Sequence, residues 1–268
     1  MVITGRYGEY FALFQGLVPF FRKDHLLLDI EWLGNDGQNR YLNHLKKIIK
    51  RFIARGAGRI GVFCEAEGRN YSAYYGIERS KFVWVPYCTD LETDDFDVRE
   101  DDYIFTGGFE QRDWETFFHA VKDIPAEVRI AAPAGRMDRR FVSGNMTLLG
   151  VLSPRQYYEA MAKSKLVALS LEPDLRRCPG VTTYVSAMKL GKAVVVNETE
   201  GSGSYITGGK TGLVVRPRDP MAMRRAIETL LADDGLRRRI AHEARIYATE
   251  HFSNDSMAGY LDRWVSRS

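Results

Sequence analysis

The chain has 268 residues, which is enough for one large domain or two modest ones with a substantial core. Apolar residues make up 45% of it and charged residues 27%, so the composition excludes a disordered chain. A net charge of +3 is too small to indicate a nucleic-acid partner, and three cysteines without CxxC spacing indicate neither a disulfide framework nor a zinc site.

The first part of the chain alternates strands and helices, the pattern of a parallel sheet with crossover helices. The apolar pattern predicts strands at Val2–Thr4, Leu26–Ile30, Ile60–Cys64 and Phe82–Val85, and helices that end near Pro19 or span Asn39–Arg55 and Glu67–Tyr75. The segment Asp90–Asp102 holds eight acids against Arg99 alone and is predicted as a linker.

The second part continues this alternation. It predicts strands at Tyr103–Thr106, Val128–Ala131, Met146–Leu149, Leu166–Leu171 and Ala193–Val196, helices at Asp113–Lys122, Pro154–Lys163, Val181–Leu190 and Ser253–Val265, and a hairpin-like GGKTGLVV. Asp219 and Pro220 are typical of a helix start. No apolar run approaches the roughly 20 residues that span a bilayer, and no signal peptide is recognisable.

The stretch Cys178–Pro220 contains the strongest functional signal. A turn with Pro179 and Gly180 opens the helix that begins at Val181, and a helix N-terminus offers backbone N–H groups and a positive dipole end to a phosphate. Further hydrogen-bonding hydroxyls on this helix belong to Thr182, Thr183 and Ser186.

A second signal lies in the letters YIFTGGFEQRDW. The predicted strand ends in Gly107 and Gly108, which let a backbone approach a ligand at the carboxyl edge, where open α/β sheets bind ligands. Arg112 lies at the start of the next helix, and its planar fork can pair with a diphosphate. The alternative is a tight strand-to-helix turn with a solvated arginine.

The order of these parts, with LLGV before the Cys178 region and SAMKLGKAVV within it, resembles the nucleotide-sugar-binding half of retaining glycosyltransferases of family 4. The resemblance implies an α/β fold of two Rossmann-like domains, the GT-B type, with an incomplete N-terminal domain. The expected boundaries are 1–98 for the partial acceptor-side domain, 99–252 for the nucleotide-sugar-binding domain and 253–268 for a C-terminal helix that can cross back to the first.

The opening letters MVITGR resemble the fourth strand of the family's first domain. About 70–100 residues of that domain are then expected to be absent, judging by the size of βαβ units. The strand Val2–Thr4 becomes an uncovered sheet edge. The chain is either a truncated product, or a partner chain or a homodimer covers that edge.

The resemblance also assigns the site. The expected catalytic residues are Arg112 and Glu172, and the expected donor-binding residues are Gly107, Gly108, Leu149, Gly150, Val151, Gly180, Val181, Thr182, Thr183 and Ser186. The main chain of Leu149–Val151 is expected to contact the nucleobase, with an ordinary turn as the alternative. Many family members carry an arginine directly after the first glycine and a lysine five residues later, but Gly108 and Asp113 stand there in this sequence.

Two glutamates eight positions apart usually complete the family's site, one at the sugar and one at the ribose. Cys178 and Ser186 stand at these positions here, and a serine accepts hydrogen bonds more weakly than a carboxylate. Glu172 can take the sugar contact, or it is a solvent-facing charge. Arg176 and Arg177 are phosphate or acceptor ligands, or plain surface charge.

The helix Asn39–Arg55 is amphipathic, with Leu42, Leu45 and Ile49 on one face and lysines on the other. Such a helix either packs on its sheet with the lysines outward or lies on an anionic membrane surface, as in family members that modify lipid-linked acceptors.

The predicted function is therefore transfer of a sugar from a nucleotide-sugar donor to a glycan or lipid-linked acceptor with retention. The expected enzyme is cytoplasmic, with membrane association as an option, and needs no cofactor, metal or nucleic acid. The alternative is a non-catalytic or partner-dependent nucleotide-sugar-binding subunit. A sugar-nucleotide epimerase of the same fold is less favoured, because no convincing set of histidine and carboxylate is present.

Overall fold

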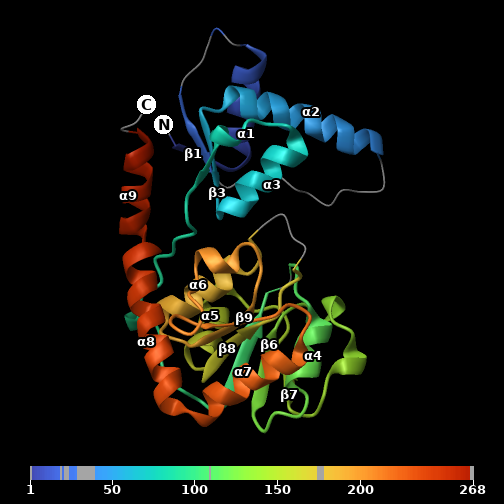
Figure 1. The fold of residues 1–268 in the computed structure, drawn as a ribbon, viewed down its shortest axis with the longest axis vertical. Coiled ribbons are helices and arrows are strands. Elements are labelled where there is room, and N and C mark those ends of the chain that lie inside the picture. The colour runs from blue at the N-terminus through green and yellow to red at the C-terminus, as the bar shows by residue number, and fades with distance from the viewer. Residues whose placement is uncertain are drawn as a thin grey trace. The chain divides into compact units, whose positions relative to one another are not determined.

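The computed structural model describes residues 2–18, 20, 24–28, 40–108, 110–173 and 178–265. The chain divides into two compact units: unit 1 comprises Met1–Pro86 and Met257–Ser268, and unit 2 comprises Tyr87–Ser256 (Figure 1). The C-terminal helix α9 (Asn254–Val265) places Met257 and Leu261 against buried strand residues of unit 1. This helix therefore returns to the first unit, as the sequence allowed.

Unit 1 contains a parallel sheet with the strand order β1-β2-β3-β4. Strands and helices alternate along this unit: β1 (Val2–Thr4), α1 (Gly5–Leu17), β2 (Leu26–Leu28), α2 (Arg40–Gly56), β3 (Arg59–Val62), α3 (Glu65–Tyr75) and β4 (Phe82–Trp84). Leu27 and Ile60 pair across β2 and β3 and are completely buried. Among the described strands β1 lies at one edge, and its cover by a partner chain or second copy stays a prediction.

Helices α1 and α2 approach each other closely at two glycines. A side chain at Gly56 would run into the carbonyl oxygen of Ala12, and one at Gly16 into that of Phe52. The amphipathic helix expected from the sequence is α2, and its C-terminal part is buried at Ile53. Toward its start, apolar side chains are between 37% and 89% exposed: Tyr41, Leu42, Leu45, Ile48 and Ile49.

Unit 2 contains a larger parallel sheet with the order β10-β9-β8-β5-β6-β7. Its elements are β5 (Tyr103–Gly107), α4 (Trp114–Val121), β6 (Glu127–Ala131), β7 (Met146–Leu148), α5 (Pro154–Ala162), β8 (Leu166–Leu169), α6 (Val181–Lys189), β9 (Val194–Asn197), β10 (Leu213–Val215), α7 (Pro220–Ala232) and α8 (Asp234–His251). From β5 the chain proceeds to β6 on one side, and from β8 to β9 on the other. The strand order thus reverses between β5 and β8, and ligands of open α/β sheets bind in the crevice at such a point.

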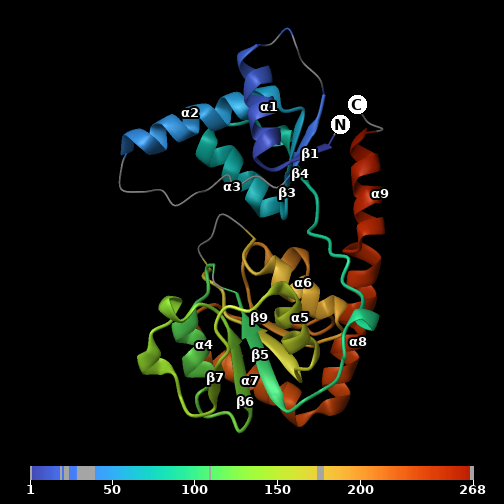
Figure 2. The same cartoon turned by 180° about the vertical axis from the view of Figure 1, so that it is seen from behind.

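Helices cover both faces of this sheet, as Figure 2 shows from behind. Helices α4 and α7 share one hydrophobic core with the sheet, in which Phe117 and Ile227 are fully buried. Helices α5 and α6 contact β5, β8 and β9. Asp113 and Asp219 cap α4 and α7 through their side chains, which confirms the helix starts predicted there.

The GGKTGLVV segment is a turn followed by a strand, and the hairpin-like prediction is wrong. The N–H of Gly209 donates to the carbonyl of Gly212 at 2.8 Å, and that of Thr207 to the hydroxyl of Thr211 at 2.9 Å. The strand β10 then pairs in parallel with β9. The glycines close a local turn after a loop, and no strand precedes them for an antiparallel pair.

The acidic segment Asp90–Asp102 is not a free linker but packs within unit 2. The N–H groups of Arg99 and Asp101 donate to the carbonyls of Ala162 and Lys163. The boundary between the units falls before Tyr87, whereas the sequence placed it at residue 98. The composition of a segment shows its like charges, but not the cations that neutralise it from distant parts of the chain.

One of these cations is Lys192, which is 2% exposed. Its Nζ donates to the carbonyls of Arg99 at 2.6 Å and Ser164 at 2.9 Å. Burial lowers the pKa of Lys192 to about 8, although Glu100 and Asp101 act in the opposite direction. Lys192 therefore has a structural role in unit 2.

The free energy of unfolding is expected to rise with pH because of Lys192. Its ordinary pKa is about 10.4 in an unfolded chain, so the unfolded state binds more protons than the folded state between about pH 8 and 10. Relative to the Lys192→Met variant, the wild type should gain about 2 kcal/mol between about pH 7.5 and 9.5 in urea titrations. The exposed Lys210, changed to Met, is the control, and a pH-independent difference for Lys192→Met contradicts the prediction.

Candidate functional site

The carboxyl edge of the sheet at β5 and β8 brings together two segments that are far apart in the sequence. Arg112 forms an antiparallel bridge with Leu171, and the N–H of Glu172 donates to the carbonyl of Gln111 at 3.1 Å. Both segments leave the carboxyl ends of their strands. The two expected catalytic residues, Arg112 and Glu172, therefore lie at the edge where the strand order reverses.

Arg112 is held there by uncharged groups. Its Nε donates to the carbonyl of Gly107 and its Nη1 to that of Glu110, both at 2.9 Å, and its Nη2 donates to the hydroxyl of Thr183 at 3.3 Å. No carboxylate of the described residues forms an ion pair with it. Burial lowers the pKa of Arg112, and neighbouring Tyr157 acts against that shift, but an arginine remains charged at neutral pH. Among the described residues, this cation has no counter-ion.

The loop before α4 is shaped around this guanidinium. Gly108 has a φ of +92°, and a side chain on it would collide with Arg112. Gln111 has a φ of +56°, a conformation that is uncommon outside glycine. Asp113, at the position of the family's second cation, instead accepts the N–H of Thr116 at 3.0 Å as the helix cap.

The N-terminus of α6 is open toward a ligand. Gly180 precedes it with a φ of +73° and supplies no side-chain cap. The N–H groups of Val181, Thr182 and Thr183 belong to the first turn, which has no acceptor inside the helix. None of the described residues accepts from them, so these donors can serve an anion.

Two tyrosine hydroxyls reach the threonines of this first turn. The Oη of Tyr157 lies 3.1 Å from the Oγ1 of Thr183, and the hydroxyl of Tyr87 hydrogen-bonds to the side chain of Thr182. Burial raises the pKa of both tyrosines, which keeps their hydroxyl groups protonated at neutral pH. The sequence analysis missed both residues, because a tyrosine in an amphipathic helix or a strand end carries no functional pattern.

The turn after β7 exposes backbone at the same carboxyl edge. Gly150 has a φ of +71° with open space around it, and Val151 is 74% exposed. Leu149 gives its N–H to the carbonyl of Ile130 at 2.9 Å, while those of Gly150 and Val151 have no acceptor among the described residues. The geometry is compatible with main-chain contacts to a nucleobase, which remain a prediction.

The two positions of the missing glutamates are both buried. Cys178 is 6% exposed and its Sγ lies 3.1 Å from the hydroxyl of Tyr184, while Ser186 is completely buried and its Oγ has no hydrogen-bond partner. A ligand outside the protein surface does not reach the Ser186 hydroxyl in this conformation. The side chain of Glu172 is 44% exposed and lies 3.7 Å from Arg218. Arg176 and Arg177 lie outside the described residues.

Asn197 fixes the segment that carries Glu172, and sequence reasoning also missed it. Its side chain accepts the N–H of Leu171 at 2.6 Å and donates to the carbonyl of the same residue at 2.8 Å. Next to it, a side chain on Gly201 would run into Cys178, so this loop packs close to the start of α6. A buried asparagine at a strand end looks like any loop residue in the sequence.

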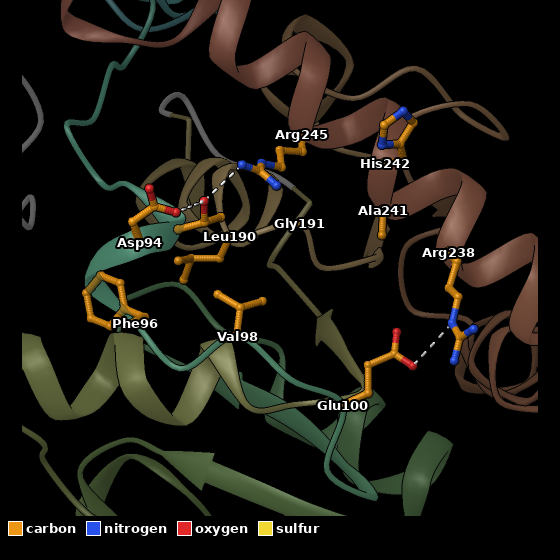
Figure 3. A pocket seen from close by; sticks show the side chains of 11 residues that line it. Asp94, Phe96, Val98, Glu100, Leu190, Gly191, Arg238, Ala241, His242 and Arg245 are labelled. Atoms are coloured by element: carbon orange, nitrogen blue, oxygen red, sulfur yellow. Dashed lines mark hydrogen bonds and ion pairs between the residues drawn. The ribbon is translucent and has the colours of Figure 1, made fainter.

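A cavity of about 570 Å³ in unit 2 lies elsewhere. It is lined by Phe96, Leu190 and Gly191 and by a row on α8 that includes Arg238 and Arg245 (Figure 3). Leu190 and Gly191 precede β9, so this cavity opens at the amino edge of the sheet, opposite the crevice. Its arginines are engaged with Glu100 and Thr93, and it has no part in the site described above.

Two kinds of feature, metal-binding groups and membrane-spanning helices, are absent from the described residues. No group of three or more histidine, cysteine, aspartate or glutamate side chains in them is placed to hold a metal ion. No helix among them is both long and apolar enough to cross a membrane.

Residues 136–247 match the sequence profile of the family described as Glycosyl transferases group 1. This segment contains β7 to β10 and most of α8, and thus the N-terminus of α6 and the turn after β7. No curated protein matches the chain.

Solved structures of glycosyltransferases share the fold at low sequence identity. Sucrose-phosphate synthase from Thermosynechococcus elongatus is 16% identical, with a TM-score of 0.72 over 95% of this chain and 71% of that one. HepE from Anabaena, in complex with UDP and glucose, is 14% identical, with a TM-score of 0.74 over 99% and 77%. A glycosyltransferase from Rickettsia africae is 12% identical, with a TM-score of 0.64 over 98% and 96%.

The fold is the one that GT-B glycosyltransferases share, with Rossmann-like domains that carry parallel sheets. Residues 136–247 are similar to group 1 glycosyltransferases. The predicted fold class and the resemblance to GT-B glycosyltransferases are confirmed, and the match of residues 136–247 supports the assignment as a transferase.

Proposed function

We propose that this chain transfers a sugar from a nucleotide-sugar donor to an acceptor with retention, in the synthesis of a glycan or glycolipid. The observation that carries the proposal is the cationic guanidinium of Arg112, which has no ion-pair partner among the described residues and lies beside the open N-terminus of α6. A diphosphate leaving group fits this pair, because both parts favour an anion.

In this scheme the chain stabilises the charge that develops on the leaving diphosphate. Arg112 and the first-turn N–H groups of α6 point at it, and preorganised donors of this kind usually supply the largest catalytic contribution. Glu172 is placed at the same edge for contact with the sugar. The scheme calls on no metal or cofactor, and retention is inferred from the resemblance to family 4.

The first experiment is a binding panel with UDP, GDP and ADP, read by thermal shift and calorimetry on the purified chain. UDP is the leading probe, since HepE was solved with UDP and with UDP-glucose. Binding of one diphosphate, followed by transfer with the donor's anomeric configuration kept in the product by NMR, is the expected result. No binding in the panel, or an inverted product, overturns the proposal.

The second candidate is a nucleotide-sugar-binding subunit that needs a partner for catalysis. The burial of Cys178 and Ser186 at the positions of the family's glutamates favours it. Donor hydrolysis or transfer is to be compared for the chain alone and with candidate partners added. Activity of the chain alone rejects this candidate.

We further propose a cytoplasmic location with an acceptor at an anionic membrane surface. The support is the exposed apolar start of α2, with Lys46 exposed on the same helix. Lys50, however, pairs with Glu9 at 2.7 Å, so not every lysine of the helix is available to lipid.

The Leu45→Glu variant is expected to lose most of the binding to vesicles that contain anionic lipid, because it places a charge where apolar contact with the interface is needed. Flotation with anionic and with neutral vesicles measures the effect. Ile246→Glu, at a position on α8 that is 42% exposed, is the matched control. Equal flotation of wild type and Leu45→Glu contradicts the membrane proposal and leaves the donor site untouched.

A further inference from the structure

The contact between Arg112, Thr183 and Tyr157 contains more hydrogen-bond donors than acceptors. A threonine hydroxyl has one proton and two acceptor sites, and a tyrosine hydroxyl has one proton. Thr183 accepts from Arg112 at 3.3 Å and shares one proton with Tyr157 over 3.1 Å. Whichever hydroxyl donates within the pair, one O–H proton stays without an acceptor among the described residues.

The guanidinium adds to this surplus. Arginine has five N–H donors, and three of those on Arg112 are used in the described hydrogen bonds, two of them toward main-chain carbonyls. Uncommitted donors are costly to leave without an acceptor when they are partly buried, and no described carboxylate compensates the charge of Arg112. The cluster is therefore arranged for an anionic acceptor that comes from outside the chain.

The backbone of β5 makes room for the phenol. A side chain on Gly107 would come within 2.7 Å of the Tyr157 hydroxyl oxygen, so the last residue of β5 must be glycine for the ring to lie there. The ring is also fixed edge-on to Phe105, with 5.2 Å between the centroids. A tyrosine locked in this way presents its hydroxyl group at a defined point of the crevice.

We infer that Tyr157 and Thr183 bind the donor's diphosphate together with Arg112, so that a phenol supplies the contact for which the family often uses a second cation. This inference rests on the proposed function. The inference also explains why Asp113, which caps α4, can occupy a position where a lysine is common in the family. The diphosphate is held instead by neutral donors from α5 and α6.

The test is the Tyr157→Phe variant, which keeps the ring and removes only the hydroxyl. The neighbouring Tyr158→Phe is the matched control, since its ring contacts Phe96 and no hydrogen bond of its hydroxyl is part of the cluster. Calorimetry is carried out with the nucleoside diphosphate that binds the wild type, with inorganic pyrophosphate and with the free nucleoside. Tyr157→Phe should weaken the diphosphate and pyrophosphate about tenfold and leave the nucleoside unchanged.

The outcomes separate the inference from the proposed function. A wild type that binds none of UDP, GDP and ADP overturns the proposed function itself. Unchanged diphosphate affinity in Tyr157→Phe, or an equal loss for the nucleoside, overturns the inference and leaves the function standing.

If Tyr157→Phe does not fold, Thr183→Val and Thr183→Ser replace it as a pair. The serine keeps the hydroxyl and should bind as the wild type does, whereas the valine should lose about tenfold. Equal affinity of the two variants overturns the inference.

Discussion

Replacing Arg112 by methionine is expected to raise the dissociation constant of the bound nucleoside diphosphate about a hundredfold and to remove most transferase activity. Methionine has a similar length but neither the charge nor the planar fork of donors. Arg112 is the one cation that the described residues place at the start of α6 without a carboxylate partner. No other described side chain at this point can therefore take over its role.

Arg112→Lys should bind more weakly than the wild type but better than the methionine variant. A lysine keeps the charge, yet it cannot donate to the carbonyls of Gly107 and Glu110 and to Thr183 in one plane. Arg239→Met removes an exposed cation from α8 and is the control for net charge. Calorimetry that gives equal dissociation constants for wild type and Arg112→Met would sink the assignment of this residue.

The alternation of strands and helices could be predicted because the central strands of unit 2, β5, β8 and β9, are short, fully buried runs. Leu166–Leu169 and Val194–Asn197 are buried at every position, which leaves apolar runs that the sequence shows directly. The glycines of the site could also be predicted from the sequence, because a turn next to a helix start often requires a positive φ angle. Gly108 and Gly180 adopt such angles. Local signals of this kind do not depend on the rest of the chain.

The contacts that complete the site depend on residues far apart in the sequence. Tyr157 meets Thr183 across α5 and α6, and Asn197 meets Leu171 across two strands. A hydroxyl or amide in a helix or strand end has no periodic pattern that reveals such a partner. The prediction of Ser186 as a donor-binding residue was limited for the same reason, because only the fold shows that its side chain is completely buried.

Charged partners that are far apart in the sequence are equally hard to predict, as the acidic segment Asp90–Asp102 shows. Its eight acids predicted a linker, but Lys192 approaches it from the turn before β9 and Arg237 from α8, and Glu100 pairs with Arg237 at 2.8 Å. Unit 2 therefore begins about ten residues earlier than a charge count suggests, and the stability of this unit should depend on these buried cations.

Arg237→Met is expected to lower the free energy of unfolding by about 3 kcal/mol. The guanidinium of Arg237 is 1% exposed and donates to Glu100 at 2.8 Å, Asp234 at 2.6 Å and the carbonyl of Leu230 at 2.8 Å. Removing it leaves that buried carbonyl without its donor and Glu100, whose side chain is 30% exposed, without its main counter-ion. Urea denaturation followed by circular dichroism measures the loss.

The adjacent Arg238 offers a close control, because it lies 3.9 Å from the same Glu100 but its side chain is 70% exposed. Arg238→Met should cost less than about 0.5 kcal/mol, since solvent screens an exposed pair. The double variant Arg237→Met with Glu100→Gln should recover part of the loss, because no carboxylate is then left without its partner. Equal losses for Arg237→Met and Arg238→Met would show that burial does not set the strength of this pair.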